Sequence, residues 1–203
     1  MKIFGIAAVL LGLLAPAMAD QEAQISSDLE WRNNFYSGER ELTAGGTAYF
    51  SPANGLSGRP TINYSGAFAQ LGYMFTDINS EGTWSANLEG LVEGYGANIY
   101  KGRGSYMAGT TLWLRCNFVP PSCKLVPYIQ AGAGLTLTDV DDRVLGQDFN
   151  FNLNLAAGVR YFASPRFSIN AEYRYQHVSN AGMSKRNLGI DAQAAVLSVS
   201  WFF

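Results

Sequence analysis

The chain ends with the sequence Ala195-Val-Leu-Ser-Val-Ser-Trp-Phe-Phe203, in which every second residue from Ala195 to Phe203 is apolar. Successive side chains of a β-strand point to opposite sides, so this alternation gives one continuous apolar face. The face finishes with Trp201 and Phe203, where a membrane-spanning strand carries its interfacial aromatic residues. A soluble domain rarely ends in this way, whereas bacterial outer-membrane barrels commonly do. The C-terminus therefore predicts the last strand of a transmembrane β-barrel.

The same alternation runs through earlier parts of the chain. From Phe151 to Tyr161 the odd positions are apolar, and most even positions are Asn, Gly or Arg. The pattern recurs from Leu125 to Leu137 and from Trp84 to Val92. A content of 22 Gly, 11 Tyr and 12 Phe also favours a membrane barrel. Because a soluble sheet alternates too, a periplasmic β-sandwich is the alternative fold.

Counting the alternating segments predicts an all-β, eight-stranded antiparallel transmembrane β-barrel of the outer membrane, since a closed bacterial barrel has an even number of strands. The predicted strands are 41–51, 64–76, 83–96, 104–115, 125–138, 149–162, 166–179 and 189–203. With a periplasmic C-terminus, the turns at 77–82, 117–122 and 163–165 are periplasmic and the loops at 51–63, 139–148 and 180–188 are external. Residues 20–40 fit no strand and are interpreted as a lead-in or an extension of the first strand.

The N-terminus predicts export. Met1-Lys2 is a positive n-region, Ile3 to Leu14 is apolar, and Ala17-Met18-Ala19 has the small-x-small form of a signal-peptidase site. We therefore expect a signal peptide over 1–19 and a single β-barrel domain over 20–203. A formal net charge of −2 and the lack of a basic run argue against a nucleic-acid partner.

The only histidine of the chain, His177, lies two residues before Ser179 in a predicted strand. Residues i and i+2 of a strand share a face, so an imidazole base and a hydroxyl nucleophile are neighbours there. This face continues the apolar, lipid-facing row of its strand. Asp191 extends the apolar row of the next strand, at roughly 30 Å from Phe203 for a rise of ~3.3 Å per residue and a tilt of ~40°. The three residues therefore form a Ser-His-Asp set near the outer-leaflet boundary.

Polar groups on the lipid face cost little only near the membrane interface. A catalytic set at that depth needs a substrate whose ester lies there, and lipid A of the outer leaflet is the abundant candidate. The plain alternative is that His177 and Ser179 are interfacial polar residues, with Asp191 a charge at the end of a loop.

These residues also carry a family resemblance. Glu172-Tyr-Arg-Tyr-Gln-His-Val-Ser-Asn-Ala-Gly182, followed by Asn187-Leu-Gly-Ile-Asp191, resembles the C-terminal signature of the PagL-type lipid A 3-O-deacylases. The resemblance implies that His177, Ser179 and Asp191 are catalytic. The acid of the best-known members is glutamate, and aspartate is one methylene shorter. The segments 114–118 and 127–134 also resemble members of this family.

The implied reaction is hydrolysis of the 3-O-linked acyl chain of lipid A, with lipid A and outer-membrane lipids as the partners and no cofactor. His177 acts as the general base, Ser179 attacks the ester, and Asp191 orients the imidazole. The side chain of Asn180 and the N–H of Gly182 are the nearest donors in sequence for an oxyanion. The sequence leaves open whether the protein forms a homodimer.

Two further groups of residues have structural interpretations. Cys116 and Cys123 flank a predicted periplasmic turn, where an oxidising compartment allows a disulfide. The sequence has no His or further Cys near this pair, so a metal site is not expected there. A set of charged residues on the inner face is expected to fill a barrel too narrow for a channel. These residues are Glu89, Glu93, Glu172, Arg160 and Arg174.

Three other functions are consistent with a small barrel. A structural or adhesion protein would not need His177 or Ser179, and a narrow pore would depend on the inner charges. A phospholipid esterase would use the same catalytic residues on a different ester. Only the products formed from lipids separate this last function from lipid A deacylation.

Overall fold

The computed structural model describes residues 29–51, 61–78, 85–140 and 142–203 of the chain. The predicted signal peptide over 1–19 lies outside these residues. In the described part of the chain, no helix is both long enough and apolar enough to span a membrane.

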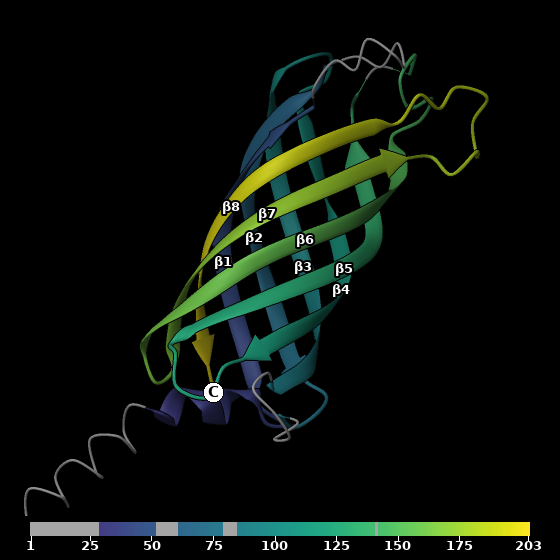
Figure 1. Ribbon diagram of the computed structural model, residues 1–203. Helices are drawn as coiled ribbons and strands as arrows, with labels where there is room; N and C mark the ends of the chain where they lie inside the picture. Colours follow the sequence, from purple (N-terminus) through teal and green to yellow (C-terminus); the bar gives the residue numbers. More distant parts are fainter. Residues whose placement is uncertain (1–28, 52–60, 79–84, 141) are drawn as a thin grey trace, which may run out of the picture.

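Eight antiparallel strands form a closed barrel in which each strand pairs with its neighbours in sequence and β1 pairs with β8 (Figure 1). We call the end that carries the C-terminus the C-terminal end and the opposite end the loop end. The strands are β1 (Arg40–Phe50), β2 (Asn63–Met74), β3 (Ser85–Lys101), β4 (Tyr106–Val119), β5 (Leu125–Thr138), β6 (Phe149–Ser164), β7 (Phe167–Ser179) and β8 (Ile190–Phe202).

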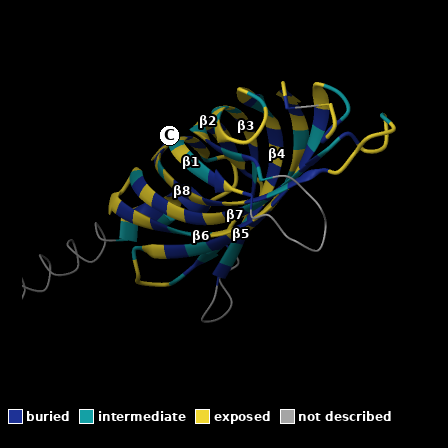
Figure 2. Ribbon diagram, turned by 90° about the horizontal axis from the view of Figure 1, so that it is seen from above, coloured by how far each residue is buried: buried dark blue, intermediate teal, exposed yellow. Residues whose placement is uncertain are grey.

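This architecture confirms the predicted fold class and all eight strands. The main difference is in length, because β3 continues to Lys101 and β4 continues to Val119. Backbone pairing explains the extension: Lys101 still pairs with Asn63, and Val119 pairs with Ser85. Buried and exposed residues alternate along the strands, as the sequence predicts (Figure 2).

The inside of the barrel is filled by charged side chains that pair with one another. Arg160 Nη2 lies 2.9 Å from Glu41 Oε2, and both side chains are fully buried. Arg174 bridges two carboxylates, at 3.0 Å from Glu93 and 2.8 Å from Glu172. The predicted inner charges are therefore present as ion pairs, and the structure adds Arg115 and Glu41, which sequence analysis missed.

The outside of the barrel carries the apolar belt that a membrane requires. Large hydrophobic side chains are exposed along the outward rows of the strands. Examples are Leu42, Leu71, Val92, Leu112, Ile129, Leu155, Tyr173 and Leu197.

A short helix closes the C-terminal end of the barrel. This 3₁₀-helix, η1 (Glu30–Phe35), lies beside the C-terminus in Figure 1. Trp31 and Phe35 are buried, and their rings lie 5.2 Å and 5.7 Å from the ring of Phe162. Asn34 Nδ2 donates a hydrogen bond to the carbonyl oxygen of Pro165. Residues 30–35 are thus a lead-in that covers the lumen, one of the two predicted interpretations of this segment.

We expect Trp31→Ala to lower the free energy of unfolding by about 3 kcal/mol, because the substitution leaves a cavity against Phe162. Urea titration of the protein in lipid vesicles, followed by tryptophan fluorescence, measures this change. Exposed Tyr36 at the end of η1 offers the control, since Tyr36→Ala removes an aromatic ring without opening a cavity. Equal losses for the two variants would contradict a packed closure.

At the loop end, hydrogen bonds link the loops that connect the strands. The Asp139 carboxylate accepts hydrogen bonds from the backbone N–H groups of Ser105 and Tyr106, at 2.7 and 3.0 Å. These two donors lower the pKa of Asp139. The turn between β3 and β4 is thereby attached to the loop between β5 and β6.

Candidate active site

His177 and Asp191 meet on the outer wall of the barrel near the loop end. They are direct cross-strand partners in the ladder between β7 and β8. His177 Nδ1 lies 2.6 Å from Asp191 Oδ1, and the two side chains are 29% and 21% exposed. Side chains directly opposite one another have Cβ atoms about 5 Å apart, so a short aspartate reaches the imidazole. The structure therefore brings the predicted base and acid into contact.

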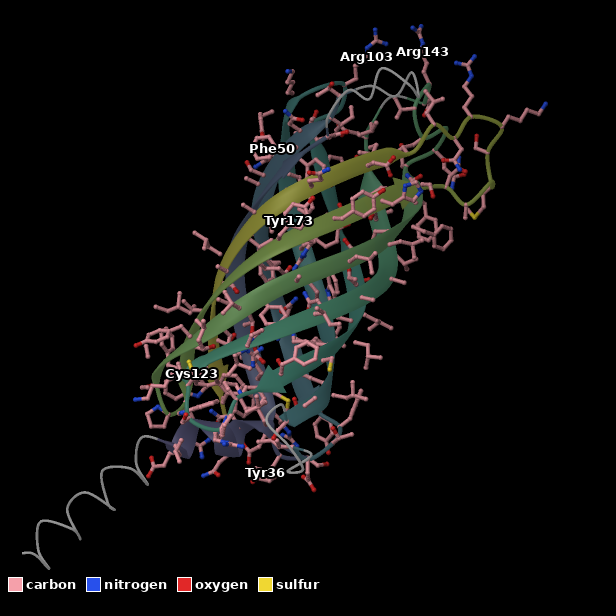
Figure 3. The ribbon with its side chains drawn as sticks, in the orientation of Figure 1. Tyr36, Phe50, Arg103, Cys123, Arg143 and Tyr173 are labelled. Carbon is pink, nitrogen blue, oxygen red and sulfur yellow. The ribbon has the colours of Figure 1, made fainter. Side chains whose placement is uncertain are left out.

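Ser179 is the next residue on the same outward row. It lies two residues beyond His177 at the end of β7 and is half-buried. Tyr173, labelled in Figure 3, belongs to this row as well. The inward row of β7 is buried, so His177 and Ser179 lie on the outward row.

The hydroxyl of Tyr175 completes this group of side chains. It donates a 2.7 Å hydrogen bond to Asp191 Oδ1, the oxygen that also contacts His177. Tyr175 belongs to the same outward row as His177, and the sequence analysis gave it no role. Its position two residues before the histidine was the available signal.

The loop between β7 and β8 is held against the loop between β5 and β6. The N–H of Leu188 donates to the carbonyl of Val144 at 2.8 Å, and Asn180 Nδ2 donates to the carbonyl of Leu145 at 2.6 Å. Val144 and Leu145 are buried with Ile190 in an apolar cluster at the loop end. This packing fixes the start of β8 and hence Asp191.

The predicted oxyanion donors, Asn180 and Gly182, make hydrogen bonds to groups of the loops at the loop end. Asn180 is fully buried, and its Nδ2 also donates to the carbonyl of Arg186. The N–H of Gly182 donates to Asn180 Oδ1 at 2.8 Å. The assignment of Asn180 and Gly182 to an oxyanion hole stays a prediction, and in this structure both groups have partners in the loops.

The predicted disulfide is not formed in this structure, where Cys116 and Cys123 are both free. The predicted strand ended before Cys116, whereas β4 continues to Val119. Cys116 therefore lies inside the strand, where it pairs with Ile129 of β5, and Cys123 lies beyond the strand in the turn. Cys123 is exposed at the C-terminal end of the barrel (Figure 3).

Gly189 lies against the edge of the imidazole. Its φ of +70° is in the region that favours glycine, and a Cβ added there would lie 3.1 Å from His177 Cε1. A side chain at this position therefore pushes on the ring as well as straining the backbone.

We expect Gly189→Ala to reduce catalytic activity by 10- to 100-fold, on the order of the loss caused by displacing a catalytic group by ~1 Å. Gly38→Ala is a matched control, because Gly38 has φ +99° but an added Cβ meets nothing within 4 Å. Steady-state rates of the two folded variants separate backbone strain from displacement of His177. Equal rates would show that the imidazole tolerates a neighbour at 189.

An apolar hollow begins at His177 on the outer wall. It has a volume of about 380 Å³, and its lining includes Leu153, Leu155 and Tyr175. A second hollow of about 480 Å³ shares Ala131, Leu155 and Tyr175 with the first and extends to Cys116 on β4. The two hollows are thus neighbours on the outer wall, over β7, β6, β5 and β4, and the first of them contains the imidazole in its lining. We call them together the outer groove.

Among the residues described, no group of three or more His, Cys, Asp or Glu side chains is arranged to hold a metal ion.

Comparison with solved structures defines the class of fold. Neisserial surface protein A matches with a TM-score of 0.58 and 19% identity, over 82% of this chain and 100% of that protein. The N-terminal β-barrel domain of Pseudomonas aeruginosa OprF matches with a TM-score of 0.53 and 20% identity, over 82% and 98% of the two chains. The fold is thus that of small outer-membrane β-barrels.

A family model gives the finer assignment. The model of the lipid A 3-O-deacylase (PagL) family matches residues 63–200. The chain therefore belongs to the PagL family. The outer membrane enzyme PagL is also found among the similar structures, with a TM-score of 0.47 and 19% identity, over 79% of this chain and 97% of that one. A search of curated proteins found no significant match.

Proposed function

We propose that this protein hydrolyses the 3-O-linked acyl chain of lipid A by a Ser-His-Asp mechanism. The observation that carries the proposal is the 2.6 Å contact between His177 and Asp191 on the outward face of a barrel of the PagL family. Ser179, the proposed nucleophile, follows on the same row.

The proposed reaction has two steps. With Nδ1–H donated to Asp191, His177 uses Nε2 to take the proton from Ser179 Oγ, which attacks the ester carbonyl carbon. Collapse of the tetrahedral intermediate breaks the bond to the sugar oxygen, which receives the proton from His177. Water then attacks the acyl-serine with His177 again as the base, releasing the fatty acid and restoring the hydroxyl.

We place the site at the boundary of the outer leaflet. His177 is near the last residue of β7 and Asp191 is near the first residue of β8, so both lie toward the loop end. Long external loops and a periplasmic C-terminus are the rule in bacterial barrels, which supports this orientation. Partly exposed polar side chains are also least costly at the interface.

The outer groove supports a substrate with a long apolar chain. Its walls are mostly alanine, leucine and tyrosine, and they include His177. An acyl chain lying along it would present its ester to the proposed base without leaving the membrane. A hydroxylated solute would gain nothing from such a lining.

The structure favours this function over a pore. In the described residues, Arg160, Glu41 and Arg174 fill the lumen as fully buried or nearly buried ion pairs. Trp31 and Phe35 cover one end. A structural or adhesion protein would have no use for the contacts that Asp191 makes.

Product analysis tests the proposal against the phospholipid alternative. The purified protein is incubated in micelles with lipid A and, separately, with phospholipid, and the products are measured by mass spectrometry. We expect lipid A to lose one hydroxyacyl chain and phospholipid to remain intact. Alkaline release of the remaining ester-linked chains then identifies the vacated position. Hydrolysis of phospholipid without hydrolysis of lipid A would show that the site acts on a phospholipid ester instead.

A further inference from the structure

The Asp191 carboxylate has two donors on one oxygen. Oδ1 lies 2.6 Å from His177 Nδ1 and accepts the Tyr175 hydroxyl at 2.7 Å. Tyr175 pairs across the ladder with Gln193, so it reaches Asp191 diagonally. Diagonal neighbours in a sheet are about 7 Å apart, a distance that an aromatic side chain spans.

The hydrogen bond from the Tyr175 hydroxyl restricts rotation of the Asp191 carboxylate. Asp191 is 21% exposed at a membrane surface, where its carboxylate can rotate toward water or toward cations bound to lipid headgroups. A carboxylate that turns away from His177 no longer holds the proton on Nδ1. Hydrogen bonds to an ionised acceptor are among the stronger ones, so the tyrosine restricts this rotation.

The geometry points to Tyr175 as a positioning residue that fixes Asp191 on His177. This inference rests on the proposed function for its catalytic consequence. The ring of Tyr175 also lines the outer groove, so one side chain joins the acyl-binding surface to the acid. An acyl chain packed on the ring would hold the hydroxyl against Asp191. The acid is then most ordered when substrate is bound.

Tyr175→Phe isolates the hydroxyl, because the phenyl ring still lines the groove. We expect kcat for lipid A to fall about tenfold, the effect of losing one hydrogen bond to a charged group, with KM unchanged. In an Asp191→Asn background the same substitution should have no further effect on kcat. Tyr161→Phe is the matched control, since Tyr161 is an exposed strand tyrosine that lines neither hollow.

A second readout does not depend on activity. His177 is the only histidine of the chain, so ¹⁵N-labelled histidine gives a single imidazole signal by NMR. We expect the wild type to carry its proton on Nδ1 and Tyr175→Phe to shift the signal toward a mixture of tautomers, while Tyr161→Phe leaves it unchanged.

The outcomes distinguish the two claims. An unchanged imidazole signal in Tyr175→Phe would overturn the positioning role, as would an equal loss of kcat in the Asp191→Asn background. A wild-type protein that leaves lipid A intact would overturn the proposed function, and the NMR signal would still decide whether Tyr175 orders the Asp191–His177 pair.

Discussion

Ser179→Ala is expected to fold into the same barrel and to release fatty acid from lipid A at least about 10³-fold more slowly than the wild type, because the alanine has no oxygen to form the acyl intermediate. Initial rates from mass spectrometry of the released fatty acid measure the loss. Ser65→Ala is the control, since Ser65 is an exposed, outward-facing serine of β2 on another part of the wall. The control should keep the wild-type rate.

The nucleophile can also be identified directly. A fluorophosphonate probe should label the wild type at Ser179 and fail to label Ser179→Ala. If the variant kept a rate near that of the wild type while His177→Ala lost it, His177 would be activating water directly and Ser179 would have no covalent role.

Glu41→Gln is expected to destabilise the barrel by about 3 to 5 kcal/mol, the cost of leaving buried charge without its partner. Glu41 contacts Arg160 at 2.9 Å and Arg115 at 3.5 Å, and its side chain is fully buried. Glutamine removes the charge at nearly constant volume, so two guanidinium groups must share Glu89. The midpoint of urea unfolding in vesicles measures the effect.

The control for this substitution is Glu30→Gln, because Glu30 is exposed at the start of η1. We expect its effect to stay within about 0.5 kcal/mol. A loss of similar size in the two variants would mean that the inner charges are solvated and do not depend on one another. Activity per folded molecule should be unchanged in both variants, since neither residue lies near His177.

The strands and their faces could be predicted because the alternation is a local property of the sequence. The row that ends at Phe203 and the row that contains His177 each set the direction of every side chain in their strand. The meeting of His177 with Asp191 needed only the assumption that adjacent strands pair near the loop end.

The remaining features depend on contacts that no single strand encodes. The reach of Tyr175 to Asp191 depends on the exact register between β7 and β8. The burial of Asn180 depends on the carbonyl groups of a second loop. Likewise, the seal formed by Trp31 depends on Phe162, which is distant in sequence. The local sequence pattern predicts the strand face or the segment in which each of these residues lies. It does not predict their contact partners, which closure of the barrel brings together.

In the proposed function, this barrel removes an acyl chain from lipid A through Ser179. The most direct test is mass spectrometry of lipid A from outer membranes that contain either the wild type or Ser179→Ala, with equal amounts of folded protein. We expect the loss of one hydroxyacyl chain with the wild type and intact lipid A with the variant. Intact lipid A with both proteins would rule out the deacylation, and the same loss with both would rule out Ser179 as the nucleophile.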